Sequence, residues 1–327
     1  MKGSQKMRVT ITDLDHDAWD IEQGVAEAEG VEFQILEDGG KDAGLDPRVK
    51  GSEGLLVQYA DITPEVMDYL LPELKVIGRY GVGVDTIDLD AAEERGITVV
   101  NVPDYGTQSV ADHAIALALA VARNLPKLDS LARRSTMDLA TAAPIHQFCD
   151  QTFGVLGFGA IGHAVATKAK GLGFTVQVND VLIPEGTTEA DGFKVVSEDE
   201  LLASSDIVSI HVPLTPDTSH MINDDKLAEM KDGAIIVNTA RGGVVDTDAL
   251  VRAVQSGKLR GAGLDVLETE PIPAGSPLLS LERVVLSPHA AYYSEESYYQ
   301  LKRRTMQNVI DVLKGRECPN IVVPRKK

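Results

Sequence analysis

The chain has 327 residues, enough for two domains of ordinary size. Of these residues 43% are hydrophobic and 25% charged, as is usual for a globular protein. It carries 31 Lys and Arg against 50 Asp and Glu, so its formal net charge is −19. Such a charge repels nucleic acid phosphates and anionic membranes, and we expect neither as a partner. Only two cysteines occur, Cys149 and Cys318, and the first residues contain no apolar segment of a secretory signal. We therefore expect a cytoplasmic protein.

Short β-rich segments alternate with helical patterns, which predicts an α/β fold of βαβ units with parallel sheets. In the first hundred residues, Thr63 and Pro64 form a typical helix start, because Thr caps the helix and Pro takes its first position. We expect strands at Arg8–Thr12, Glu32–Leu36, Gly54–Gln58, Lys75–Arg79 and Thr98–Asn101, and helices at about Ala18–Glu29, Pro64–Leu71 and Leu89–Arg95.

A long Ala/Leu-rich helix is predicted over Val110–Leu125. It has no polar face, so we expect it to be buried between domains, with a bend at Pro126. The change of composition before it makes Pro103–Thr107 the candidate hinge.

A second α/β series follows. Strands are predicted at Phe153–Leu156, Thr175–Asn179, Ile207–His211, Ala234–Asn238, Gly261–Asp265 and Val284–Leu286, with a helix at Ala160–Lys170. A final helix over Glu295–Leu313 is expected to return to the first domain.

A glycine motif lies between a predicted strand and a predicted helix; it reads Gly157-Phe158-Gly159-Ala160-Ile161-Gly162. Its first glycine permits a tight turn, its second lets the backbone approach a pyrophosphate, and its third lets the helix pack on the strand. Asp180 ends the next strand, where a carboxylate accepts hydrogen bonds from the ribose hydroxyls and repels a 2′-phosphate. No Lys or Arg follows in 181–183, so the motif predicts NAD rather than NADP. The alternative is a Gly-rich turn beside a surface Asp.

Four further motifs carry a family resemblance: RYGVGVDTIDL (79–89), NTARGGVVD (238–246), GLDVLETEP (263–271) and SPHAAYYSEE (287–296). Together with the glycine motif they resemble the D-isomer-specific 2-hydroxyacid dehydrogenases, and most of all the branch that includes the C-terminal-binding-protein group. The resemblance implies two Rossmann-like or flavodoxin-like domains with parallel sheets and a cleft between them. Residues 1–102 with 291–327 would form the substrate-binding domain, and residues 103–290 the NAD-binding domain.

The resemblance also implies a catalytic set. Arg241 matches the residue that binds the substrate carboxylate, and a guanidinium suits this role because it binds a carboxylate with two parallel hydrogen bonds. His289 matches the acid/base, whose ordinary pKa near neutrality fits proton transfer. Glu270 matches the carboxylate that pairs with it, and Glu268 is the competing choice. No metal is expected.

The remaining site residues follow from the same resemblance. Asp265 is expected to contact the nicotinamide side of the cofactor, with a strand-end turn as the alternative. Other predicted cofactor contacts are the motif 157–162, Asp180, His211, Val212, Pro213, Thr218, Thr239, Ala240, Arg241 and His289. Predicted substrate contacts are Tyr59, Val82, Gly83, Arg241 and Tyr292. His113 is read as a satisfied histidine between domains rather than a ligand.

The function implied is hydride transfer between nicotinamide C4 and C2 of a small 2-oxo or 2-hydroxy acid, in a homodimer. The alternative from another class is an NAD(H)-sensing regulatory scaffold. Formate dehydrogenase is disfavoured because Gln, not Glu, partners its histidine, and phosphoglycerate dehydrogenase because many members carry an additional regulatory domain. The chain departs from the family over 134–139, where a Gly and a Trp are usual.

Overall fold

The computed structural model describes residues 7–13, 18–184 and 186–324. It divides into two compact units. The first consists of Met1–Gly106 with Ser294–Lys327, and the second of Thr107–Tyr293. These boundaries lie a few residues beyond the predicted ones, and the assignment of substrate binding to the first unit stays a prediction.

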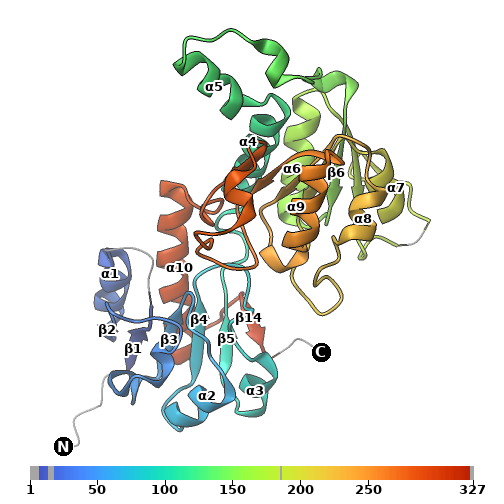
Figure 1. The fold of residues 1–327 in the computed structure, drawn as a ribbon. Helices are drawn as coiled ribbons and strands as arrows, with labels where there is room; N and C mark the ends of the chain where they lie inside the picture. Colours follow the sequence, from blue (N-terminus) through green and yellow to red (C-terminus); the bar gives the residue numbers. More distant parts are fainter. Residues whose placement is uncertain (1–6, 14–17, 185, 325–327) are drawn as a thin grey trace, which may run out of the picture. The chain divides into compact units, whose positions relative to one another are not determined.

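The first unit is built on a six-stranded sheet with the order β14-β5-β4-β3-β1-β2 (Figure 1). All pairs are parallel except β14 with β5. Its strands are β1 (Arg8–Ile11), β2 (Glu32–Ile35), β3 (Gly54–Val57), β4 (Val76–Arg79), β5 (Thr98–Val100) and β14 (Ile321–Val323). Its helices are α1 (Asp20–Glu29), α2 (Pro64–Leu70), α3 (Leu89–Glu94) and α10 (Glu295–Leu313), with 3-10 turns η1 (Ala43–Leu45) and η2 (Pro47–Val49). The predicted parallel α/β fold is confirmed here.

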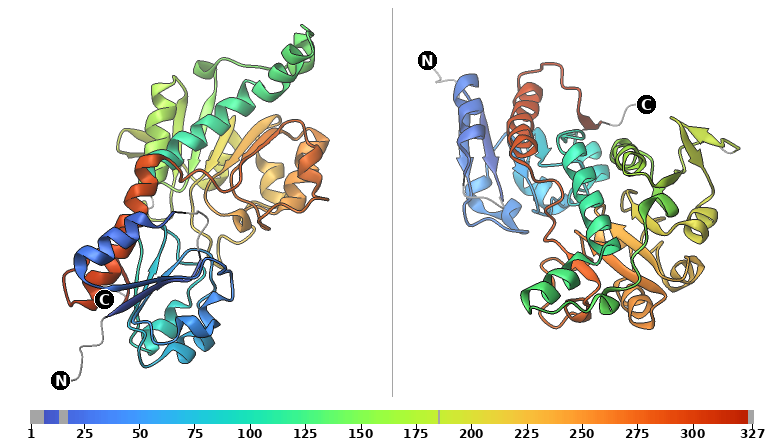
Figure 2. Two further views of the ribbon diagram at one scale, coloured as in Figure 1. Left: turned by 90° about the vertical axis from the view of Figure 1, so that its left-hand side faces the viewer. Right: turned by 90° about the horizontal axis from the view of Figure 1, so that it is seen from above.

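Helix α10 spans the residues predicted for the last helix. Ser294 caps it, and the Ser297 side chain bonds back to the Ser294 backbone in a reciprocal capping box. The helix buries Leu301, Met306 and Val309 and packs against β3, β4 and α1. Both views of Figure 2 show α10 and α1 side by side.

The second unit contains an eight-stranded sheet with the order β13-β12-β11-β10-β6-β7-β9-β8. Only the short pair β8–β9 is antiparallel. The strand order reverses between β6 and β10, which is the point where open α/β sheets bind ligands at the carboxyl ends of their strands. The strands are β6 (Thr152–Leu156), β7 (Thr175–Asn179), β8 (Glu189–Ala190), β9 (Phe193–Val195), β10 (Ile207–Ile210), β11 (Ala234–Asn238), β12 (Leu259–Leu264) and β13 (Val284–Leu286).

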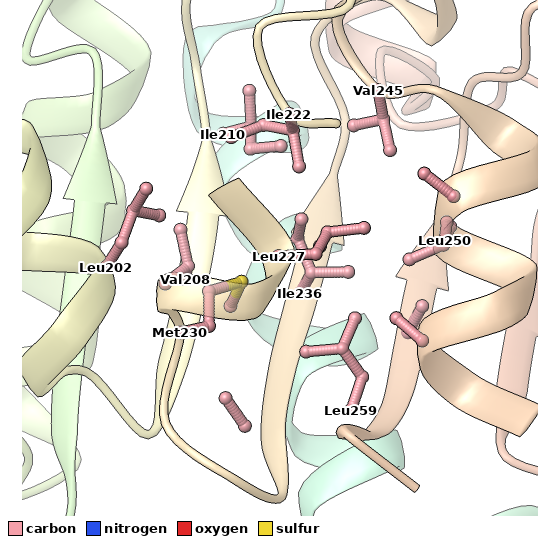
Figure 3. Packing of buried hydrophobic residues seen from close by; sticks show 14 of the residues in the cluster. Leu202, Val208, Ile210, Ile222, Leu227, Met230, Ile236, Val245, Leu250 and Leu259 are labelled. Carbon is pink, nitrogen blue, oxygen red and sulfur yellow. The ribbon is translucent and has the colours of Figure 1, made fainter. Parts of the chain in front are cut away.

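Alternation along the strands gives this sheet two buried faces. In β11, Ile236 packs in one hydrophobic cluster, whereas Ile235 and Val237 pack in another. Figure 3 shows the first cluster, where Val208 and Leu250 are also buried. The helices of the unit are α4 (Thr107–Ala122), α5 (Leu125–Arg133), α6 (Ala160–Gly171), α7 (Glu198–Ser204), α8 (Asp224–Glu229) and α9 (Thr247–Ser256), with 3-10 turns η3 (Leu139–Ala142), η4 (Phe148–Asp150), η5 (Gly242–Val244) and η6 (Pro277–Ser280).

The apolar helix α4 differs from its prediction in its bounds, and its predicted location between domains stays a prediction. It begins at Thr107 and ends at Ala122, and it packs against α6, β11 and β12 of its own unit. A Cβ at Gly263 in β12 would lie 2.8 Å from Leu117 Cβ, so the glycine permits this close approach. Pro126 does not bend the helix. The chain turns at Asn124, whose φ is 50°, and Pro126 lies in the first turn of a separate helix, α5.

No helix in the described part of the chain is long and apolar enough to cross a membrane.

Candidate active site at the carboxyl edge of the second sheet

The glycine motif connects β6 to α6, and each of its glycines has a different physical reason. Gly157 has φ 94°, and a Cβ there would lie 2.7 Å from the His211 backbone. A Cβ at Gly162 would lie 2.0 Å from the Gly157 carbonyl oxygen. At Gly159 a Cβ would meet nothing within 4 Å. The first and third glycines therefore serve the fold, whereas the open space at Gly159 is where a phosphate can approach the backbone.

Asp180 follows β7 and holds the glycine motif from the side. Its Oδ2 accepts a hydrogen bond from the Phe158 N–H at 2.6 Å, and its Oδ1 accepts one from the Leu182 N–H at 2.8 Å. An ionised carboxylate offers about four lone-pair sites, so it can still accept from ribose hydroxyls. Val181 and Leu182 beside it are almost fully exposed, and the ribose contact of Asp180 stays a prediction.

His211, Val212, Pro213 and Thr218 follow β10. The His211 Nε2 lies 2.8 Å from the Ser209 Oγ, and the Thr218 hydroxyl donates to the Pro213 carbonyl at 2.6 Å. Burial of the ring lowers the pKa of His211 to about 3, although the residue as a whole is only partly buried. The predicted contact of His211 with the cofactor stays a prediction.

Arg241 lies in a tight turn after β11. The Asn238 side chain organises the turn: its Nδ2 donates to the Arg241 carbonyl at 2.9 Å and its Oδ1 accepts from the Ala240 N–H at 3.0 Å. A Cβ at Gly242 would lie 1.9 Å from the Leu267 carbonyl carbon, so only glycine lets this turn approach the loop after β12. We did not predict the role of Asn238; its place in the NTARGG motif was the available signal.

His289 and Glu270 form a hydrogen-bonded pair. The His289 Nδ1 lies 2.7 Å from the Glu270 Oε2, and the Glu270 Oε1 accepts from the Leu267 N–H at 2.8 Å. Burial raises the pKa of Glu270, but the bonds to His289 and Leu267 and the charge of Arg241 outweigh it and lower the pKa overall. Glu270 is therefore ionised at neutral pH. The competing Glu268 instead binds His220 Nε2 at 2.5 Å and the Thr247 N–H at 2.7 Å.

Asp265 directly follows β12 and binds the segment that carries His289. Its carboxylate accepts from the Ser287 hydroxyl at 2.5 Å and from the N–H groups of Ala290 and Ala291 at 2.8 and 2.9 Å. Its carbonyl accepts from the His289 N–H at 2.8 Å. His289 has φ 54°, an uncommon value outside glycine that costs about 1 kcal/mol or more. From the sequence, Asp265 was expected to contact the cofactor, with a strand-end turn as the alternative, and Ser287 had no predicted role. The contacts at the end of β12 are those of the alternative, whereas the cofactor contact stays a prediction.

The predicted substrate residues are distributed over both units. Tyr59 and Val82 are exposed and lie with Gly83 in the first unit, where the buried Asp13 carboxylate accepts from the Tyr59 N–H. The Val82 carbonyl accepts from the Asn101 amide at 2.7 Å. Tyr292 belongs to the second unit, with its ring centroid 6.5 Å from that of His289. The substrate roles of these residues stay predictions.

The residues of the second unit also fit a dinucleotide. Besides the open face of Gly159, the hydroxyl of Thr239 is buried without a hydrogen-bond partner. Buried polar atoms of this kind are rare unless a ligand or water satisfies them. The glycine loop, Asp180, Thr239 and the Arg241–Glu270–His289 set all lie at the carboxyl ends of parallel strands. The fold and site define a dinucleotide-dependent dehydrogenase.

Comparison with known proteins agrees with this class. The family model "D-isomer specific 2-hydroxyacid dehydrogenase, NAD binding domain" matches residues 115–291. A glyoxylate reductase of Korarchaeum cryptofilum is 41% identical over 84% of this chain and 84% of its own length. A D-3-phosphoglycerate dehydrogenase of Methanocaldococcus jannaschii is 38% identical over 98% of this chain, which spans 61% of that longer protein. The crystal structure of D-lactate dehydrogenase from Aquifex aeolicus, complexed with NAD and lactic acid, is 32% identical, with a TM-score of 0.85 over 98% of this chain and 100% of that one.

The chain belongs to the D-isomer-specific 2-hydroxyacid dehydrogenase family. It is an NAD-dependent oxidoreductase of the CH–OH group of 2-hydroxy acids. The predicted family, fold class and cofactor are thereby confirmed, whereas the closer resemblance to the C-terminal-binding-protein group stays a prediction.

Proposed function

We propose that the protein reduces a small 2-oxo acid to its D-2-hydroxy acid, with Arg241, Glu270 and His289 as the active residues. The observation that carries the proposal is the 2.7 Å bond between His289 and Glu270, in a site where the Arg241 charge also acts on Glu270. The proposed set thus combines a cation, a carboxylate and a histidine that can transfer a proton. The matching glyoxylate reductase of Korarchaeum cryptofilum supports a short substrate.

In the proposed reaction, Arg241 binds the substrate carboxylate and orients the 2-oxo group. Bound NADH supplies the hydride that C2 accepts. Glu270 accepts from Nδ1 of His289, which leaves Nε2 to face the substrate and give its proton to the 2-oxo oxygen. In the reverse direction the same nitrogen accepts the hydroxyl proton. The products of reduction are the 2-hydroxy acid and NAD⁺, and His289 takes up one proton from the solvent, so that protons and electrons balance over the cycle.

The pyrophosphate of the cofactor would lie on the open face of Gly159 and the first N–H groups of α6. The Thr239 hydroxyl would gain a hydrogen-bond partner on the bound cofactor. Asp180 would accept from the adenine ribose, and its negative charge would disfavour the 2′-phosphate of NADP. Tyr59, Val82, Gly83 and Tyr292 are proposed substrate contacts, and Asp265, His211, Val212, Pro213, Thr218 and Ala240 cofactor contacts.

We further propose a homodimer that functions in the cytoplasm. The support for a dimer is the exposure of Leu125, Met137 and Leu139 on and after α5; for example, Met137 is 91% exposed. Large apolar side chains gathered on one segment are typical of protein contacts. Both cysteines are free, in agreement with a reducing compartment. The dimer is tested by analytical ultracentrifugation, in which the Met137→Ser variant should sediment as a species of lower mass than the wild type.

The function is tested by the loss of NADH absorbance with a series of 2-oxo acids: glyoxylate, pyruvate, hydroxypyruvate, phenylpyruvate and 4-methylthio-2-oxobutyrate. The His289→Ala variant should lose the activity. His220→Ala is the matched control, because His220 also pairs with a glutamate but lies outside the proposed catalytic set. NADH binding without turnover of any acid would favour the regulatory scaffold, and turnover retained by His289→Ala would contradict the mechanism.

A further inference from the structure

His113, on the apolar helix α4, contacts the strand-end segment that carries His289. Its Nε2 lies 2.8 Å from the Ser287 Oγ and 3.5 Å from the Asp265 Oδ1. Helix α4 and this segment are 174 positions apart in the chain at this contact. Both belong to the second unit, so the contact lies within one compact body.

The chemistry of the three groups fixes the direction of the hydrogen bonds. The Asp265 carboxylate can only accept, and the Ser287 hydroxyl has one proton, which it donates to Asp265 at 2.5 Å. The Ser287 oxygen can then serve His113 only as an acceptor. Nε2 of His113 must therefore carry a proton and act as the donor.

Asp265 connects these hydrogen bonds to the segment that carries His289. Its side chain is 1% exposed. Its two carboxylate oxygens accept hydrogen bonds from the N–H groups of Ala290 and Ala291, and its carbonyl accepts one from the His289 N–H. These bonds keep His289 at φ 54°, a conformation that a histidine leaves unless its surroundings enforce it. The hydrogen bonds from His113 through Ser287 to Asp265 are thus connected to the backbone of His289, the proposed acid/base.

We propose that His113 is a positioning residue: through Ser287 and Asp265 it fixes residues 287–291, so that His289 stays oriented on Glu270. This rests on the proposed function of His289. The competing view is that His113 only fills space on α4, in which case the volume at this position matters and the Nε2 donor does not.

Two substitutions separate these views. His113→Gln keeps an N–H donor at nearly the same place, whereas His113→Leu keeps the approximate volume and removes the donor. Ser287→Ala removes the bridge with a smaller change of packing. We expect kcat to fall about tenfold or more in His113→Leu and Ser287→Ala, since small displacements of a catalytic group are costly, and to stay within about threefold in His113→Gln. The KM for NADH should change by less than about threefold in all three.

The double variant His113→Leu/Ser287→Ala tests the pathway. Because both residues act through one series of bonds, its kcat should be no lower than that of the worse single variant. Losses that multiply would mean that His113 acts independently of Ser287, which overturns the proposal. If His113→Leu does not fold, Ser287→Ala and His113→Gln still decide: wild-type kcat in the first, or a tenfold loss in the second, would each contradict it.

A readout independent of turnover is the imidazole signal of His289 in nuclear magnetic resonance of the full-length protein saturated with NAD. The Nδ1 proton bonded to Glu270 should exchange faster with solvent in His113→Leu than in the wild type, and His113→Gln should restore slow exchange. An unchanged exchange rate in His113→Leu would overturn the positioning role. This holds even if no tested acid is a substrate, so failure of the proposed function is recognised separately.

Discussion

Glu268 and Glu270 are separated by a single residue, yet their carboxylates bind different histidines: Glu268 binds His220 and Glu270 binds His289. The two pairs have similar hydrogen-bond lengths, 2.5 and 2.7 Å. They differ in their surroundings: the charge of Arg241 is among the causes that lower the pKa of Glu270, whereas Glu268 also accepts a hydrogen bond from the Thr247 N–H. The molecule therefore contains its own control for the catalytic pair.

Glu270→Gln should lower kcat for 2-oxo acid reduction by about 10²-fold, because the amide no longer favours the protonated imidazole that delivers the proton. Glu268→Gln should change kcat by less than about threefold. Steady-state rates of NADH oxidation at saturating substrate make the comparison. Equal losses in the two variants would show that the Glu270 pair has no special part in proton transfer.

Arg241→Lys tests whether the guanidinium geometry is needed or only its charge. Lysine keeps the cation but cannot form two parallel bonds to a carboxylate, so KM for the 2-oxo acid should rise about tenfold or more. The affinity for NADH, measured by fluorescence quenching, should change little. A KM close to that of the wild type would remove Arg241 from the substrate carboxylate.

The two glycines Gly157 and Gly159 should separate stability from cofactor affinity. A methyl group at Gly157 would lie 2.7 Å from backbone atoms of His211, and the positive φ of Gly157 is unfavourable for alanine. Gly157→Ala should therefore lower the melting temperature by several degrees. At Gly159 the methyl group has open space, so Gly159→Ala should melt like the wild type.

The same Gly159→Ala variant should nevertheless bind NADH at least about tenfold more weakly, because its Cβ would occupy the place proposed for the pyrophosphate. Titration calorimetry gives the affinity and calorimetric melting gives the stability. Unchanged NADH affinity would move the phosphate site away from Gly159.

His211 should make folding stability depend on pH in the acid range. Burial lowers the pKa of His211 from 6.5 to about 3 in the folded protein. Between about pH 6.5 and pH 3, His211 is therefore protonated in the unfolded chain but neutral in the folded protein. The free energy of unfolding should therefore fall as the pH decreases from about 6.5 to about 3, by at most about 1.4 kcal/mol per pH unit from this group.

His211→Gln removes the titration while keeping a polar partner for Ser209. The difference in unfolding free energy between wild type and variant should be constant above about pH 7 and should shift against the wild type below it. Urea denaturation at a series of pH values measures this. A difference that does not change with pH would contradict the buried, neutral histidine.

The extent to which the sequence determines the site can be seen residue by residue. Local patterns predicted the strand–glycine loop–helix unit because the three glycines and Asp180 act within about 25 positions of one another. Family motifs predicted Arg241, Glu270 and His289 as a set. The structure brings Glu270 and His289 into contact, and the charge of Arg241 acts on Glu270.

The unpredicted features depend on contacts between distant parts of the chain or on turns. The link of His113 to Ser287 joins a helix to a strand end far along the sequence, and no local pattern records it. The break between α4 and α5 depends on the left-handed turn at Asn124, a conformation that Asn adopts more readily than most residues but that no residue pattern in the Ala/Leu-rich segment indicated. The contacts of Asp265 could not be predicted from the sequence, because they depend on how residues 287–291 curve around its carboxylate.

Because the backbone at His289 is left-handed, selection for folding and selection for catalysis favour different residues at this position. A selection for foldedness alone should enrich Gly and Asn at this position, since these residues adopt φ near 54° most readily, and neither has a side chain that transfers protons near neutral pH. A selection for turnover should retain histidine alone, against its conformational preference. Position 289 is thus a place where variants that improve the fold and variants that keep the chemistry form separate populations.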